Sequence, residues 1–218
     1  VNYELAIGEE AKEEVPIIVN EILEEFECLI PEGPPLGYKP IRLINDLEGG
    51  PTLYWPLERD VYKIGLNISD IFYTQVAFQL AQEVSRIYCD PRISNWFIEL
   101  IDHVVALYML ESISEKWEEK PPLPELQDYY DHFTKYRSNL LAAAFSKIDI
   151  IKYQITNEWV KNQVRKIMNK ETYNRGKLLI IAYEMLSLFK QSNENWRILP
   201  YIGRCSIPAP SEDLRNMV

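Results

Sequence analysis

The sequence predicts a mainly helical α+β protein in which a small sheet near the N-terminus packs on a helical body. From residue 69 onward, apolar residues recur at three- and four-residue spacing in nearly every segment, which is the period of an amphipathic helix. Between residues 38 and 67, short alternating runs are separated by glycine and proline. The 218 residues, of which 47% are hydrophobic, are enough to bury the core of one large domain. We therefore expect a single domain over residues 1–206 and a loose C-terminal tail over 207–218.

A long helix is expected over residues 9–30. Its apolar positions recur at helical spacing, at Val15, Ile18, Ile22, Phe26 and Leu29. Pro16 fits the first turns, and the prolines at 31, 34 and 35 end the helix. Much of the acidity lies here, at Glu9, Glu10, Glu13, Glu14, Glu21, Glu24, Glu25 and Glu27. Such a run is typical of a solvated helix face, and docking of a basic partner is the alternative.

The sheet is expected from three short segments, over residues 40–44, 52–55 and 61–67. Gly49, Gly50 and Pro51 form a turn between the first two. A sheet of two to four strands is too small for a sandwich or a barrel. It therefore covers part of the helical body.

Helices account for most of the remaining chain. One is expected over 70–88 with Ser69 or Asp70 as its cap, and a second begins at Ser94 or Asn95 and ends near 117. Prolines between 121 and 124 break the pattern. Further helices are expected over 124–146, 156–169 and 171–192, with a short piece near Trp196.

Composition excludes several classes of function. The formal net charge of −10 opposes binding to nucleic acid or to anionic membranes. No basic segment followed by an apolar run marks a signal peptide, and no apolar stretch approaches the roughly 20 residues that span a bilayer. The three cysteines include no CxxC pair, so we expect reduced, buried thiols in a cytoplasmic protein. A glycine-rich phosphate loop and a GxSxG motif are both absent.

The informative segment runs from Tyr73 to Tyr88 and is followed by Asn95-Trp-Phe-Ile-Glu-Leu-Ile-Asp-His103. Gln82 and Arg86 are four residues apart on a helix, so both project from one face, with Glu83 beside them. In zinc peptidases this spacing belongs to the HExxH motif. There, two histidines hold the metal and the glutamate activates water.

The order of motifs resembles that of small bacterial gluzincin-type metallopeptidase-like proteins. An alternating strand at 62–67 leads into a helix whose approach reads Phe78-Gln79-x-Ala81, followed by Gln82-Glu83-Val84-Ser85-Arg86 and by Asn95-Trp96-Phe97-x-Glu99. The resemblance covers residues 60–117 best. It implies a zincin-like active-site helix in the fold, with Glu99 or His103 at the position of the third zinc ligand.

The metal-binding residues of that pattern are replaced. Gln82 is a weak neutral ligand, and Arg86 is a permanent cation that repels Zn²⁺. Glu83 keeps the general-base position, but it has no metal-bound water to activate. We therefore expect no metal and no cofactor. Instead, Arg86 is expected to take the charge role of zinc by pairing with Glu83 or Glu99, while Gln82 forms a hydrogen bond across the gap. A substitute metal site at Glu83, Glu99, Asp102 and His103 is disfavoured by the adjacent Arg86.

These residues favour a non-catalytic, metallopeptidase-like protein, a pseudoenzyme whose old cleft binds a peptide or protein partner. Two alternatives stay open. The chain is a hydrolase with an altered metal site and Glu83 as general base, or it is a structural or regulatory subunit that docks through its acidic N-terminal helix. Without the flanking pattern, Gln82, Glu83 and Arg86 would be ordinary polar residues on an amphipathic helix.

Overall fold

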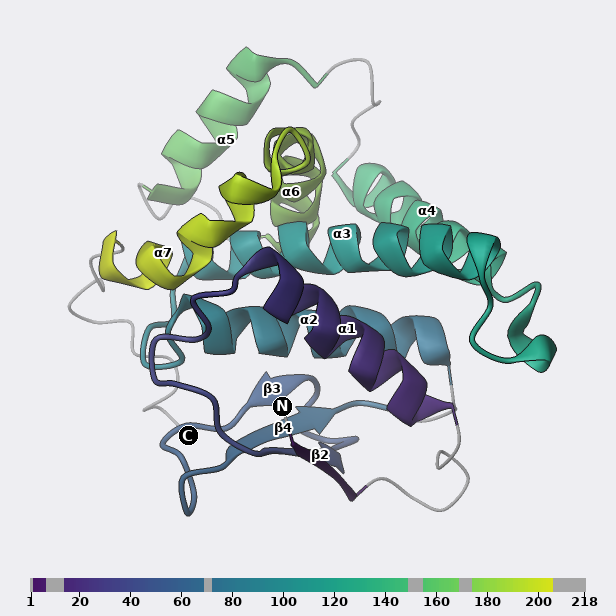
Figure 1. Cartoon of the computed structure of the whole chain (residues 1–218). Coiled ribbons are helices and arrows are strands. Elements are labelled where there is room, and N and C mark those ends of the chain that lie inside the picture. Colours follow the sequence, from purple (N-terminus) through teal and green to yellow (C-terminus); the bar gives the residue numbers. More distant parts are fainter. Residues whose placement is uncertain (1, 7–13, 69–71, 149–154, 169–173, 206–218) are drawn as a thin grey trace.

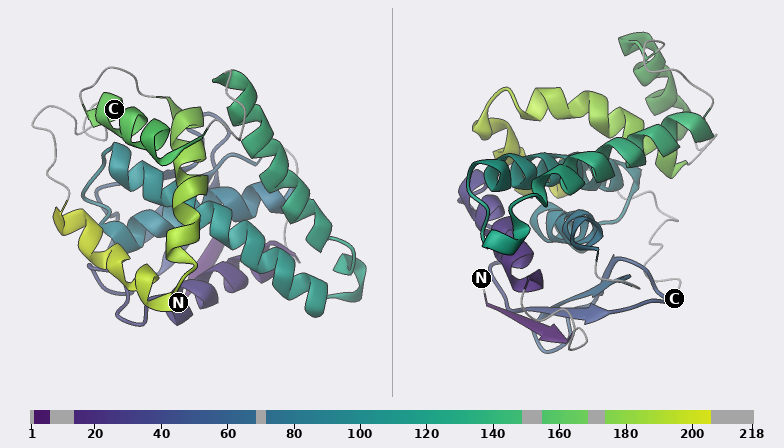
Figure 2. Two further views of the ribbon diagram at one scale, coloured as in Figure 1. Left: turned by 90° about the horizontal axis from the view of Figure 1, so that it is seen from above. Right: turned by 90° about the vertical axis from the view of Figure 1, so that its right-hand side faces the viewer.

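The computed structural model of the chain describes residues 2–6, 14–68, 72–148, 155–168 and 174–205. In these ranges a small sheet lies under a stack of helices (Figure 1). Helix α2 packs on the sheet with α1 beside it, and α3 covers α2. Helices α4 and α6 lie on the far side of α3 (Figure 2). This arrangement confirms the predicted α+β, mainly helical fold.

The sheet has four strands in the order β1-β2-β4-β3. The parallel strands are β1 (Tyr3–Ala6), β2 (Ile41–Asn45) and β4 (Tyr62–Leu66), and β3 (Thr52–Leu53) runs antiparallel to β4 at one edge. The predictions for β2 and β4 are confirmed, and β3 is shorter than the segment predicted. Strand β1 was not predicted, because four residues that alternate between half-buried and exposed give a weak pattern.

Helix α1 (Val15–Leu29) has Pro16 in its first turn, where a missing N–H leaves no helical bond unmade. Residues 9–13 of the predicted helix lie outside the described residues. Two of the predicted acidic side chains pair with the body of the protein, since Lys116 contacts both Glu21 and Glu25.

Helices α2 (Tyr73–Cys89) and α3 (Trp96–Glu119) carry the informative segment. Helix α3 was predicted to begin at Ser94 or Asn95, and Asn95 is its cap: the Asn95 side chain accepts hydrogen bonds from the N–H groups of Phe97 and Ile98, both at 3.0 Å. The predicted cap of α2 is wrong, because the N-cap position is Phe72. Ser69 and Asp70 lie outside the described residues.

The C-terminal half is helical, with a 3₁₀ turn before α4 and another before α7. Its elements are η2 (Pro124–Leu126), α4 (Tyr130–Lys147), α5 (Asn157–Met168), α6 (Arg175–Phe189), η4 (Asn193–Ile198) and α7 (Leu199–Cys205). The helix predicted over 124–146 begins later, after the proline-rich turn. Helix α7 was not predicted as a separate element, and the tail over 207–218 lies outside the described residues.

Helix α3 forms the centre of the core. Apolar side chains are buried on all its sides, among them Ile101, Val105, Leu110 and Trp117. A helix that is apolar all round is stable only when other elements surround it, and α2, α4 and α6 do so here. Burial of each large side chain stabilises the fold by about 1.5–3 kcal/mol.

The side chains of Cys28 and Cys89 differ in their exposure. Cys89 is buried as a free thiol, but Cys28 is exposed, which corrects the prediction of buried thiols throughout. Cys28 lies on the solvent-facing side of α1, away from the apolar stripe of the helix. None of the helices within the described ranges is long and apolar enough to cross a membrane.

Candidate functional site

The structure brings the five predicted site residues to one pocket between α2 and α3. Gln82, Glu83 and Arg86 come from α2, and Glu99 and His103 come from α3. The spacing of four residues within each helix puts these side chains on the faces that meet.

The pocket has a volume of about 320 Å³ and opens beside strand β3. Gly49, Gly50 and Pro51, which lead directly into β3, form part of its wall. Phe78 of α2 and Tyr136 of α4 supply aromatic lining, and Arg175 comes from the first residue of α6. No sequence pattern linked the residues of α4 and α6 to this site.

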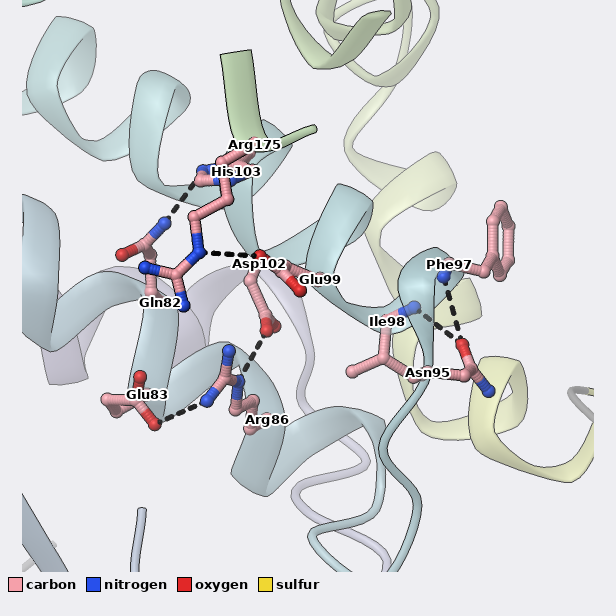
Figure 3. A network of polar contacts seen from close by, with 10 residues as sticks. All are labelled: Gln82, Glu83, Arg86, Asn95, Phe97, Ile98, Glu99, Asp102, His103 and Arg175. Carbon is pink, nitrogen blue, oxygen red and sulfur yellow. Dashed lines mark hydrogen bonds and ion pairs between the residues drawn. The ribbon is translucent and has the colours of Figure 1, made fainter. Parts of the chain in front are cut away.

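Arg86 forms the centre of a buried ionic network (Figure 3). Its Nε donates to Oδ2 of Asp102 at 2.6 Å, and its Nη1 donates to Oε2 of Glu83 at 3.2 Å. The carboxylate side chains are only 0% and 2% exposed, and that of Arg86 is 21% exposed. Burial works against the charge of Arg86, but Glu83 and Asp102 outweigh it and raise the pKa of its guanidinium. Arg86 therefore stays protonated, and the two carboxylates offset its charge.

The expected pair between Arg86 and Glu83 is present, whereas the second carboxylate is Asp102 rather than Glu99. Glu99 pairs instead with Arg175, whose Nε lies 3.4 Å from Oε1 of Glu99. Burial raises the pKa of Glu99, an effect that Arg175 opposes. Burial also raises the pKa of Asp102, and Arg86 opposes that shift in the same way.

His103 is held by the expected hydrogen bond across the gap, in which Gln82 Nε2 lies 2.7 Å from His103 Nδ1. An amide nitrogen can only donate, so in this orientation of Gln82 the imidazole accepts at Nδ1. Burial lowers the pKa of His103 to about 3, and the charges of Arg86 and Arg175 lower it further. Its Nε2 is buried and has no hydrogen-bond partner in the described part of the chain.

No protein-family model, curated protein or solved structure matches this chain. The resemblance to gluzincin-type proteins therefore stays a prediction from the sequence, and the site is interpreted from its own geometry.

The residues of the pocket do not fit a zinc ion. Zinc prefers imidazole nitrogen, thiolate sulfur and carboxylate oxygen in a tetrahedral set, and an arginine cannot serve as a ligand. Here the guanidinium of Arg86 contacts both nearby carboxylates, so a second cation at the same place would be repelled. Within the described ranges, no group of three or more histidine, cysteine, aspartate or glutamate side chains is placed to hold a metal ion.

Strand β3 offers a second feature beside the pocket. The N–H of Tyr54 donates to the carbonyl of Lys63 at 2.9 Å, so this pair is hydrogen-bonded across the antiparallel ladder. Such ladders alternate, and the backbone N–H and C=O of Leu53 therefore point away from β4. Because β3 is last in the strand order, this side of the strand forms the edge of the sheet.

Proposed function

We propose that this chain is a non-catalytic, metallopeptidase-like protein that binds an extended peptide or protein segment along β3, with one side chain of the segment in the adjacent pocket. The observation that carries the proposal is the position of the Arg86 guanidinium, between Glu83 and Asp102 in a pocket whose wall continues into β3, the last strand of the sheet. A fixed cation supplies no Lewis acid and activates no water, whereas an edge strand beside a pocket supports recognition.

The hydrolase alternative has less support. Glu83 would act as general base, but its carboxylate is 2% exposed and is engaged by Arg86. The docking alternative through the acidic helix also has less support. Glu21 and Glu25 pair with Lys116, and Glu25 accepts a hydrogen bond from Tyr108 at 2.6 Å, so this part of the acidic face packs internally. A cytoplasmic location remains part of the proposal and rests on the absence of a CxxC pair among the three cysteines.

A displayed library of random dodecapeptides tests the binding function. Enriched peptides are expected to bind the wild-type protein in fluorescence anisotropy titrations and to bind a Gln82→Ala variant at least several-fold more weakly. Gln127→Ala, at an exposed position away from the pocket, is the matched control and should bind like the wild type. If no peptide is enriched, or if both variants bind equally well, the pocket is not the binding site.

Backbone pairing along β3 is tested on the ligand. N-methylation of alternate amides of an enriched peptide should weaken binding only at every second position, because neighbouring residues of a strand point their N–H groups to opposite sides. The same peptides, incubated with the protein and excess Zn²⁺, should remain intact by mass spectrometry. Cleavage, together with one equivalent of zinc that survives dialysis, would establish the hydrolase alternative instead.

A further inference from the structure

The pocket already holds a guanidinium that belongs to the protein itself. Arg175, at the start of α6, reaches across to Glu99 of α3 (Figure 3). Its side chain is 84% exposed, whereas that of Glu99 is only 20% exposed. A cation at the mouth of the pocket is thus paired with a carboxylate that is mostly withdrawn from water.

The contact between the two is weak. The separation of 3.4 Å between Nε and Oε1 is longer than the roughly 2.7–2.9 Å of a strong charge-assisted hydrogen bond. A long, exposed side chain also loses conformational entropy when it is held in one place. Glu99 can therefore exchange Arg175 for another cation at little net free energy.

The rest of the lining suits a cationic side chain as well. Arg86 is paired with two buried carboxylates, which offset its charge, and His103 is neutral. The rings of Phe78 and Tyr136 lie 6.1 Å apart, centroid to centroid, and Phe78 stacks near His103. Such rings favour a planar guanidinium over their faces.

His103 contributes a neutral ring to the wall of the pocket. His103 is 8% exposed and lines the pocket, and its Nε2 has no hydrogen-bond partner within the described ranges. Because this nitrogen is itself buried, a bound side chain would meet the ring of His103 rather than its Nε2.

We propose that the pocket selects an arginine side chain of the bound segment, whose guanidinium replaces that of Arg175 on Glu99. This inference rests on the proposed peptide-binding function and specifies its ligand. Arg175 then acts as an internal competitor, which keeps Glu99 paired when the pocket holds no ligand. The net charge of −10 on the chain also attracts a basic segment toward the protein.

The test uses N-acetylated, C-amidated hexapeptide pools in which one position is fixed as arginine, lysine, citrulline or glutamate and the others are randomised. Citrulline keeps the shape of arginine without its charge. Pools with a fixed arginine are expected to bind at least about tenfold more tightly than citrulline pools in fluorescence anisotropy competition, because the ion pair forms in a partly buried site.

Three variants assign the preference to its residues. Glu99→Gln, which is isosteric, should remove the difference between arginine and citrulline pools. Arg175→Gln should tighten binding of arginine pools several-fold by removing the competitor. Arg165→Gln makes the same charge change at an exposed position of α5 and should have no effect. Thermal melts of all three variants establish that each is folded before binding is measured.

Several outcomes would overturn the inference. A preference for glutamate pools, equal binding of arginine and citrulline pools, or a preference that survives Glu99→Gln would each exclude the arginine site and leave the peptide-binding function standing. Weaker binding by Arg175→Gln would mean that Arg175 contacts the ligand directly. Stronger binding of lysine pools than arginine pools would keep a cation site but exclude selection for a guanidinium. If no pool binds at all, the proposed function itself fails.

Discussion

Arg86 lies between two carboxylates that are almost wholly removed from water, Glu83 at 2% and Asp102 at 0% exposure. Burying these charges is unfavourable on its own, because each loses its hydration. The guanidinium offsets that loss with one hydrogen bond to each carboxylate. A single residue thereby determines both the stability of the α2–α3 interface and the absence of a zinc ligand at this position.

Replacing Arg86 with methionine is expected to destabilise the protein strongly. The variant keeps an unbranched stem but leaves Glu83 and Asp102 without a cation, which costs about 3–5 kcal/mol for a buried pair. Urea denaturation followed by circular dichroism measures the loss. Arg42→Met is the matched control: Arg42 is 46% exposed and pairs with Glu4, which is 63% exposed, so its removal should cost less than about 1 kcal/mol. Equal losses in both variants would contradict a buried network. Adding Asp102→Asn to Arg86→Met should recover part of the stability.

His103 makes folding sensitive to acid. Its pKa is lowered to about 3 in the folded protein, and the ordinary value near 6.5 applies when the chain is unfolded. The unfolded chain therefore binds the extra proton first, so the His103 contribution to stability is full above pH 6.5 and is lost as the pH falls toward 3.

Replacing His103 with glutamine removes this contribution. Between pH 7.5 and pH 5, the wild type is expected to lose about 2 kcal/mol more of its unfolding free energy than His103→Gln. Urea denaturation at both pH values measures the difference. Comparing the two proteins separates His103 from groups that titrate in both, including Asp102, whose raised pKa acts in the opposite direction. If both proteins lose the same amount of unfolding free energy over this pH range, His103 is charged in the folded protein.

At the scale of elements, the sequence predicted features that depend on neighbouring residues and missed features that depend on distant ones. The residue types before the apolar run predicted a helix start at Ser94 or Asn95, and the Asn95 side chain accepts two backbone hydrogen bonds there. Helix α2 begins at Tyr73 without a side-chain cap, so residue type gave a wrong start there. Strand β1 was missed because its stability comes from pairing with β2, which lies far along the chain. Helix α7 was missed because its burial depends on α2.

Because α7 packs on α2, Gly203→Ala is expected to destabilise the protein rather than stabilise it. In an exposed helix this change stabilises by about 1 kcal/mol. Here a Cβ at Gly203 would lie 2.8 Å from the Cβ of Asp90 and would also clash with the backbone carbonyl of Cys89. Since backbone atoms cannot move aside easily, we expect a net loss of roughly 1–3 kcal/mol. The midpoint of urea denaturation measures it. A rise in stability would mean that α7 does not pack closely against the end of α2.

At the scale of the whole molecule, the pocket is assembled from elements that are distant in the sequence. The pair of helices at 73–119 could be predicted because its residues repeat with helical spacing. Tyr136 and Arg175 could not, since their place in the pocket depends on how α4 and α6 pack on α3. The sequence therefore predicted the residues that α2 and α3 contribute to the pocket, Gln82, Glu83, Arg86, Glu99 and His103, and not those of α4 and α6.

The position of α3 at the centre of the core predicts a single cooperative unfolding transition. Helix α3 contacts α2 on the side of the sheet and α4 and α6 on the other side, so neither half keeps its core when α3 is lost. Far-UV circular dichroism and tryptophan fluorescence, which reports on the buried Trp117 and Trp196, should give the same midpoint in urea. Arg86→Met, located between α2 and α3, should shift both midpoints by the same amount. Separate midpoints would mean that the sheet with α1 and α2 unfolds independently of the remaining helices, and residues 1–206 would then not form one domain.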